Sequence, residues 1–171
     1  MINTLGAILS ELDKISDIDL RTGCLKFFKT YSDKFTTWPA SIAFHHTGKG
    51  GLMEHTHEVI DLSLKIAGVL DTPVDHNHLI AAAFLHDFGK INDYKPDPEF
   101  KRDFVYVIPK GSEHSLFPVI FYPSITGKAL PLEVSHAILS HMGGWSVTSV
   151  FPYSILDAVL HSADLISSRM G

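Results

Sequence analysis

The sequence predicts a single all-α domain, a helical bundle of about six to seven helices, and three observations support that prediction. Apolar residues recur every three to four positions through most of the chain, which is the period of an amphipathic helix. The patterns typical of a parallel sheet or a sandwich are absent. The composition of the 171 residues, 45% apolar and 19% charged, is typical of a chain that builds a core.

Seven segments carry the helical pattern: 5–12, 19–35, 51–70, 76–88, 112–122, 132–141 and 152–170. Trp38-Pro39 should end the second helix, because proline bars the chain from continuing as a helix. Asp75 is expected to cap the fourth helix and Gly89 to end it. Residues 92–110 are rich in Pro, Asp and Lys, so we expect a long loop with one strand at 104–108.

Composition also narrows the class of protein. The 14 Lys and Arg against 19 Asp and Glu give a net charge of -5, which argues against stable binding to duplex nucleic acid. The single cysteine, Cys24, suits a reducing compartment and the N-terminus lacks a signal-peptide pattern, so a cytoplasmic protein is expected. The longest stretch without charged residues, 134–156, contains two glycines and Pro152, so no membrane association is expected.

Histidine is unusually frequent, with 11 residues. Five positions each lie on or near a separate expected helix: His55, the pair His86-Asp87, His114, His141 and Asp164. Counted from His55 with His86 for the pair, neighbouring positions are 31, 28, 27 and 23 residues apart, and such gaps let a helical bundle bring one residue per helix to a shared centre. Imidazole and carboxylate donors suit Mn, Co, Ni, Zn or Fe.

The segment AAAFLHDFGKI places two adjacent ligand residues at the end of an apolar helix. Burying an unpaired imidazole and carboxylate there is costly, so a cation is expected. Asp87 has two oxygens and could bridge two ions about 3.5–4 Å apart. Lys90 could face the same cavity and contact a phosphoryl oxygen. The alternative is that His86-Asp87 is a capped helix end and Lys90 a solvated charge.

Four blocks, in order, resemble those of the HD-domain metal-dependent phosphohydrolases. LHDFGK resembles the HD motif, and WPASIAFHHTGKGGLMEHTHEV resembles the segment with the first metal-binding His in bacterial 3′-5′ exoribonucleases that join an OB-fold to an HD domain. SHAILSHMG resembles their later His motif, and LDAVLHSADLISS resembles the closing segment with the terminal Asp. The resemblance covers about 35–169. It implies that 1–171 is one HD domain, with N-terminal helices in 1–35 and the motif-bearing core in 36–170.

The resemblance also implies roles for individual residues. The positions matching one metal site are His55, His86, Asp87 and Asp164, and the extra histidines of the two-metal branch match His114 and His141. Asp87 would bridge two divalent transition-metal ions and act with Lys90 as a catalytic residue. A metal-activated water would attack phosphorus in line, while the ions and Lys90 stabilise charge on the phosphoryl oxygens.

Residues outside these motifs leave alternatives open. His46 and Lys49 flank a Gly-rich turn whose backbone could approach an anion, so they join Lys90 as candidate substrate-binding residues. A packing histidine and a solvated lysine are the alternatives. His161 either hydrogen-bonds a ligand residue or packs in the core. The loop 92–110 is either solvated or a lid. The five remaining histidines are expected to be structural or exposed: His45, His57, His76, His78 and His136.

Three functions remain open. The first is a phosphohydrolase acting on nucleotides or short oligonucleotide 3′ ends. Only about 35 residues precede the match, too few for an OB-fold, which disfavours long single strands as substrates. The second is a mixed-valence di-iron oxygenase, which some two-metal HD proteins are. The third is a non-catalytic nucleotide-binding regulatory domain. Association into a homo-oligomer is left open in all three.

Overall fold

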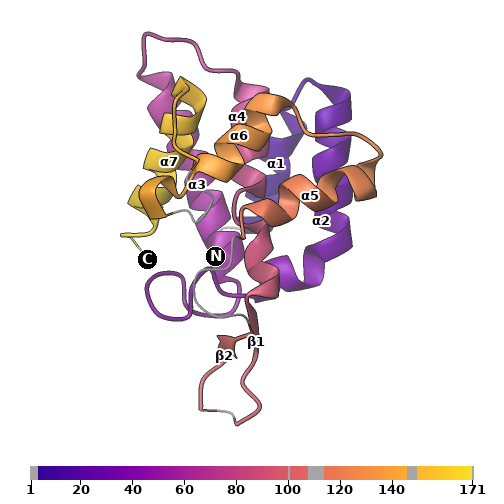
Figure 1. Ribbon diagram of the computed structural model, residues 1–171, viewed down its shortest axis with the longest axis vertical. Helices are drawn as coiled ribbons and strands as arrows, with labels where there is room; N and C mark the ends of the chain where they lie inside the picture. The colour runs from indigo at the N-terminus through magenta and orange to yellow at the C-terminus, as the bar shows by residue number, and fades with distance from the viewer. Residues whose placement is uncertain (1–3, 100, 108–113, 146–149, 171) are drawn as a thin grey trace.

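The computed structural model describes residues 4–99, 101–107, 114–145 and 150–170 (Figure 1). In these residues the α-helices are α1 (Thr4–Asp13), α2 (Ile18–Thr37), α3 (Gly51–Gly68), α4 (His76–Leu85), α5 (Leu116–Thr126), α6 (Leu132–Ser140) and α7 (Ile155–Ser167). The shorter elements are the 3₁₀ helices η1 (Phe88–Asn92) and η2 (Gly143–Trp145) and the strands β1 (Tyr94–Pro96) and β2 (Phe104–Tyr106). The predicted all-α fold is confirmed. None of these helices combines the length and apolar character needed to cross a bilayer.

The ends of α2 follow from its flanking residues. The Asp17 carboxylate accepts a hydrogen bond of 3.0 Å from the backbone N–H of Leu20, which begins the helix. Trp38 is extended (φ -80°, ψ 154°), because a residue before proline avoids the helical conformation. The break predicted at Trp38-Pro39 is therefore confirmed.

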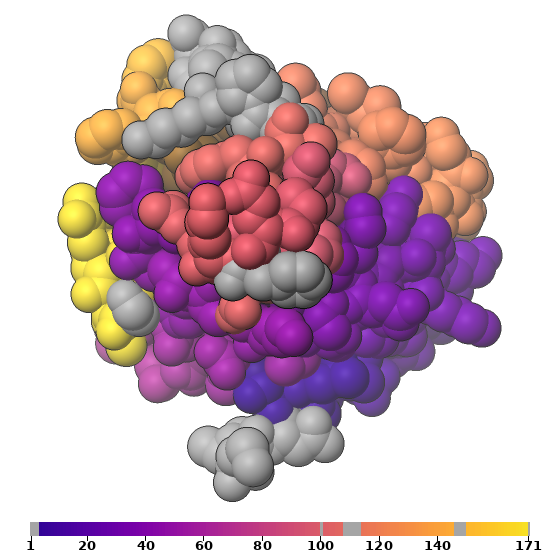
Figure 2. All heavy atoms as spheres, turned by 90° about the horizontal axis from the view of Figure 1, so that it is seen from below, coloured from indigo at the N-terminus to yellow at the C-terminus, as the bar shows by residue number. Residues whose placement is uncertain are grey.

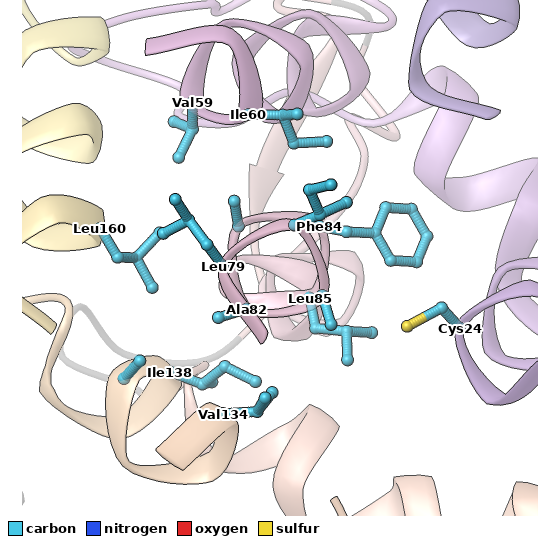
Figure 3. Packing of buried hydrophobic residues seen from close by; sticks show 14 of the residues in the cluster. Cys24, Val59, Ile60, Leu79, Ala82, Phe84, Leu85, Val134, Ile138 and Leu160 are labelled. Atoms are coloured by element: carbon cyan, nitrogen blue, oxygen red, sulfur yellow. The ribbon is translucent and has the colours of Figure 1, made fainter. Parts of the chain in front are cut away.

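Helix α4 lies at the centre of the hydrophobic core (Figure 3). Every residue from Leu79 to Leu85 is buried, and a helix that is apolar on all sides must be covered on all sides. Side chains of α3, α6 and α7, together with Cys24 of α2, surround it in Figure 3. The Asp75 side chain caps its start, as predicted, by accepting from the backbone N–H of Asn77. The residues that follow α4, His86 and Asp87, therefore lie in the protein interior.

The prediction that α4 extends to residue 88 and is ended by Gly89 was wrong. The helix ends at Leu85 rather than at residue 88, and the chain continues into η1, which contains Gly89. A Cβ atom on Gly89 would lie 2.0 Å from the backbone oxygen of His114. Glycine is thus needed here because the backbone before α5 passes directly over η1, and it does not act as a helix terminator.

Two later helices begin further along the chain than predicted. Helix α5 begins at Leu116, and residues 112–113 lie outside the described chain. The helix continues past Pro123 to Thr126, and Gly127 ends it with a left-handed conformation (φ 78°). Helix α7 begins at Ile155 because Ser154 and Asp157 form a reciprocal capping box. That Ser-x-x-Asp spacing is a helix-start signal that lies inside the segment predicted as helical, 152–170.

A short β-hairpin projects from one end of the bundle (Figure 1). Strands β1 and β2 are antiparallel, with Tyr94 opposite Tyr106, so the single strand predicted at 104–108 has a partner. Residue 108 lies outside the described chain. The indole N–H of Trp38 donates to the carbonyl of Tyr94 at 3.1 Å, and its ring packs on Phe104. Viewed from below, the hairpin lies over the α2–α3 region (Figure 2).

Candidate metal centre

Four donor side chains meet where α3, α4 and α7 come together. We call them the four-donor set: His55 on α3, His86 and Asp87 just after α4, and Asp164 on α7. The Nε2 atom of His55 lies 3.1 Å from Asp164 Oδ1, 3.2 Å from Asp87 Oδ2 and 3.3 Å from His86 Nε2. Two ligands bound to one transition-metal ion at about 2.1 Å lie roughly 3.0–3.4 Å apart. The spacing of these donors therefore fits a single ion.

A second cluster, the three-donor set, consists of Asp87, His114 and His141. The Nε2 atom of His114 lies 3.0 Å from Asp87 Oδ1 and 3.4 Å from His141 Nε2. Asp87 thus turns Oδ2 toward the four-donor set and Oδ1 toward the three-donor set. The structure brings together all six residues for which the resemblance implied a role as metal ligands.

The buried imidazoles are oriented to offer the same nitrogen to the centre. The Nδ1–H of His86 donates to the carbonyl of Ala83 at 2.8 Å, and the Nδ1–H of His141 donates to the carbonyl of Ile138 at 2.6 Å. These bonds place the proton on Nδ1 and leave the Nε2 lone pair toward Asp87. Burial also lowers the pKa of His86 to about 3, so its ring is neutral, which is the form that binds a metal.

The carboxylate of Asp87 is the strongest indication of a cation. Both its oxygens are buried, and among the described residues neither accepts a hydrogen bond of regular geometry. Burial alone would raise the pKa of Asp87, but the positive charge of Lys90, together with the imidazoles around the carboxylate, lowers it well below its ordinary value. A buried, ionised carboxylate whose two oxygens face imidazole nitrogens on both sides is a donor set that suits a divalent transition metal.

A chain of hydrogen bonds supports His55 from behind. The Ser167 hydroxyl donates to Glu58 Oε2 at 2.8 Å, so its oxygen is free to accept from His55 Nδ1–H at 2.9 Å. The same Glu58 oxygen lies 3.2 Å from Nε2 of His46. His46, a predicted substrate-binding residue, therefore lies beside the centre but is engaged with Glu58. Its role in binding substrate stays a prediction.

Lys90 lies where the sequence predicted it. Its Nζ is 2.6 Å from Asp87 Oδ2. Burial alone would lower the pKa of Lys90, but the Asp87 carboxylate more than offsets this and the pKa is raised, so the ammonium stays charged. Lys90 also lines a pocket of about 410 Å³ that opens beside His141 and Asp164. The role of Lys90 in contacting a phosphoryl oxygen stays a prediction.

The same pocket contains residues that sequence reasoning missed, namely Phe44, His45, Trp145 and Arg169. Burial, with the charges of Lys90 and His55, lowers the pKa of His45 to about 4, so this ring is neutral at pH 7. The signal for His45 was present in the His45-His46 pair. For Trp145 it was the Gly-Gly-Trp that follows His141.

Lys49 is not brought to the centre. Its side chain is exposed and lines a separate hollow beside the hairpin, together with Trp38, Arg102 and Phe104. His136 is structural, as predicted, because its Nδ1 lies 3.0 Å from Asp157 Oδ2 in the α7 cap. The structure supports the ligand-residue alternative for His161, whose Nδ1–H donates to the backbone carbonyl of His141.

Comparisons with known proteins agree with this geometry. The family model described as "HD domain" matches residues 52–168, which contain all six donors. A second model, described as a putative helicase, matches residues 5–91 and so shares part of the same segment. No Gly-Lys pair in the sequence is followed by Ser or Thr, as the phosphate-binding loop of nucleoside-triphosphate-driven enzymes requires. The chain belongs to the HD domain family.

Curated relatives are phosphodiesterases and nucleases. The chain is 32% identical over 174 residues to the dihydroneopterin 2′,3′-cyclic phosphate phosphodiesterase of Methanocaldococcus jannaschii, covering 92% of this chain and 66% of the relative. It is 26% identical over 149 residues to the 3′-5′ exoribonuclease YhaM of Listeria innocua; the match covers 83% of this chain and 46% of the relative. The YhaM of Bacillus velezensis is 25% identical over the same length. The chain thus spans less than half of the exoribonucleases. No solved structure gives a significant match.

Proposed function

We propose that this protein is a metal-dependent phosphohydrolase that cleaves phosphoester bonds of nucleotides or short oligonucleotide 3′ ends. The observation that carries the proposal is the buried Asp87 carboxylate, which offers one oxygen to each of two donor sets, while other members of those sets, His141 and Asp164, line an open pocket. Hydrolytic sites with two metal ions use such a shared carboxylate. The six donors would hold two divalent ions from among Mn, Co, Ni, Zn and Fe.

Divalent ions bound at these donors would lower the pKa of a bound water from 15.7 toward about 7 and so supply the nucleophile. The chain's own residues bind and orient the substrate. The charged Lys90 ammonium can donate to a phosphoryl oxygen, which stabilises the negative charge that develops there. Neutral His45 lines the same pocket and can share a hydrogen bond with the substrate.

The relatives support this class of substrate. One is a phosphodiesterase for dihydroneopterin 2′,3′-cyclic phosphate and the others are 3′-5′ exoribonucleases, so the names of both describe cleavage of phosphodiesters. We propose that a nucleoside cyclic phosphate or a short oligonucleotide is the substrate here, and that the protein acts in the cytoplasm. The single thiol, Cys24, is buried and takes no part in this chemistry.

The test is to replace the shared carboxylate. We expect Asp87→Ala to lose both ions and to lower kcat/KM by more than the 10–100-fold typical of residues that only support metal ligands. Elemental analysis measures the ions. Phosphate release with Mn²⁺, Co²⁺ or Ni²⁺ against nucleotides, cyclic nucleotides and short RNA measures activity.

Asp61→Ala is the matched control, because Asp61 is an exposed α3 carboxylate that pairs only with Lys65 in the described chain. It should keep wild-type metal content and rate. If the Asp87→Ala protein releases phosphate at the wild-type rate, the proposed function is wrong. Uptake of oxygen by an iron-loaded protein, without hydrolysis of any substrate, would point instead to the oxygenase branch.

A further inference from the structure

The pocket beside the metal centre has two unlike ends. Its inner end is polar and charged, formed by Lys90, His141 and Asp164. Its most exposed lining, which we call the outer wall, includes the aromatic residues Phe44 and Trp145 together with Leu165 and Arg169. The phosphohydrolase mechanism uses only the inner end. The outer wall is therefore available to recognise a part of the substrate that does not react.

The two aromatic side chains are unusually open to solvent. Trp145 is 79% exposed and Phe44 is 68% exposed. Large aromatic side chains gain more than other residues from burial, and exposed apolar patches beside a polar centre are typical of ligand-binding grooves. Both rings lie on the wall of a pocket instead of packing into the core, where Phe27, Phe35 and Phe84 are fully buried.

The fold holds Trp145 at this position by a specific turn. Gly143 adopts a left-handed conformation, with φ of 54°, immediately after the α6 segment that ends in His141. A Cβ atom on Gly143 would lie 2.9 Å from the ring of His161 on α7. The His161 ring is in turn fixed by its hydrogen bond to the His141 carbonyl. Trp145 is thus tied to a metal-ligand residue through a turn that only glycine permits.

The size of the pocket limits what it accepts. Its volume of about 410 Å³ is near the lower end of the range of about 300–1,000 Å³ that is typical of small-molecule sites. This is enough for one ring system joined to a short phosphorylated chain. Among the described residues that line the pocket, Phe44 and Trp145 are the large aromatic side chains, fewer than the successive aromatic platforms on which single-strand-binding proteins stack nucleotides.

We propose that the aromatic wall binds a planar nitrogen heterocycle, stacked on Trp145 and Phe44, while the phosphate attached to that heterocycle lies at Lys90 and the metal centre. The substrate is then a single ring-bearing phosphoester and not a polymer. The placement of the phosphate at the metal centre rests on the proposed function. The placement of the ring does not, because binding of the ring can be measured without any turnover. A purine, a pyrimidine or a pterin ring would each meet the requirement.

The first experiment compares two substrates in the metal-loaded enzyme: adenosine 2′,3′-cyclic phosphate and ribose 2′,3′-cyclic phosphate, which lacks the ring. We expect wild-type enzyme to prefer the first by about tenfold or more in kcat/KM, since stacking of one base on an aromatic side chain contributes about 1–3 kcal/mol. Trp145→Ala and Phe44→Ala should each reduce that preference toward one, chiefly by raising KM for the ring-bearing substrate. The matching cytidine and pterin compounds identify which ring is favoured.

Phe121→Ala is the matched control. Phe121 is an aromatic residue of α5 that is 45% exposed and does not line the pocket. This variant should keep the wild-type preference. Adenylyl-3′,5′-adenosine should show no lower KM than the mononucleotide, whereas a KM that falls steadily with oligonucleotide length would overturn the proposal in favour of a polymer substrate.

The second experiment needs no catalysis. The chain has two tryptophans, so Trp38→Phe leaves Trp145 as the reporter. Titration with adenosine or a free pterin should quench its fluorescence, and ribose should not. Quenching without hydrolysis of any substrate would support the ring site and reject the proposed function. Hydrolysis without quenching, and with equal rates for ring-bearing and ring-free substrates, would overturn the ring site alone. Absence of both would reject both.

Discussion

The two donor sets that meet at Asp87 are built differently. In the four-donor set, His55 and His86 have no exposed surface and come from helices whose faces form the core. In the three-donor set, His114 precedes α5 instead of lying within a helix, whereas Asp164 of the four-donor set lies within α7. More donors on more rigid elements bind an ion more tightly, whereas fewer donors leave positions for water and substrate. We therefore expect one firmly held ion and one that exchanges.

The largest effect should separate the two sets directly. His55→Ala removes a donor from the four-donor set, and we expect loss of the firmly held ion with a decrease in kcat/KM of more than a hundredfold. His114→Ala should instead lose one ion of two and keep the other. Elemental analysis after extensive dialysis measures both. His57→Ala, two residues from His55 and outside both sets, is the control. Equal losses from His55→Ala and His114→Ala would mean that the sets are not independent.

The second test acts on the backbone beneath His114. Gly89→Ala would place a Cβ atom 2.0 Å from the His114 carbonyl oxygen and so push the start of α5 away from Asp87. We expect the exchangeable ion to be lost while the firmly held ion remains, with a loss of stability of roughly 1–3 kcal/mol from overpacking. Denaturant unfolding measures the loss of stability, and elemental analysis measures the loss of the ion. Gly68→Ala, with no atom within 4 Å of the new Cβ, should change neither. If the Gly89→Ala protein retained both ions, the contact between Gly89 and the His114 backbone would not be what positions His114.

A smaller effect is expected from the hydroxyl behind His55. Ser167→Ala removes the acceptor for His55 Nδ1–H, and such supporting residues typically contribute 10–100-fold to metal affinity. Competition with a fluorescent chelator should show weaker binding of the firmly held ion only. Ser168→Ala is the comparison, because that hydroxyl donates to the Leu165 carbonyl. An unchanged affinity in Ser167→Ala would show that His55 needs no support.

The smallest effect concerns pH. Burial alone would lower the pKa of His55 and of His141, but the carboxylates of Asp87 and Asp164 raise both above the ordinary value of 6.5. In metal-free protein these ion pairs are complete below pH 6.5 and are lost as the pH rises through the raised pKa values, so their contribution to stability falls. Metal ligands must be deprotonated, so the stabilisation by ions rises over the same range.

Thermal unfolding from pH 6.5 upward, with a chelator and with added Mn²⁺, should therefore give pH slopes of opposite sign. His141→Gln in metal-free protein should flatten the falling slope. Slopes of the same sign in both conditions would show that the histidines do not titrate as these ion pairs require.

Much of the candidate metal centre could be predicted from the sequence, because its donors lie on or next to separate helices and in motifs with a fixed order. The position of His114 relative to Asp87 could not, since it depends on two backbones that touch at Gly89. That glycine was interpreted locally, as a helix terminator. Its actual role is a contact between residues 25 positions apart, which no local pattern encodes.

The substrate pocket was harder to predict for a related reason. The glycines around Lys49 predicted that it binds substrate. In the structure, His46 (φ 45°) and Gly50 (φ 82°) adopt left-handed conformations in this loop, and Lys49 lies beside the hairpin. His45, and not Lys49, lines the pocket beside the metal centre. Trp145 reaches it through the turn at Gly143, and the direction of that turn is set by contact with α7. Loop direction follows from tertiary contacts, so composition alone could not find it.

The position of α4 has a consequence for the life of the protein in a cell. Because this helix is covered on all sides, His86 and Asp87 reach the other donors only after the whole bundle has closed around it. An ion therefore binds the folded chain and not the unfolded one. At a free metal concentration a thousand times the dissociation constant, such linkage stabilises a protein by about 4.1 kcal/mol. The abundance of the folded protein should then follow the supply of metal, and starvation for the ion would expose the chain to proteolysis before any substrate is encountered.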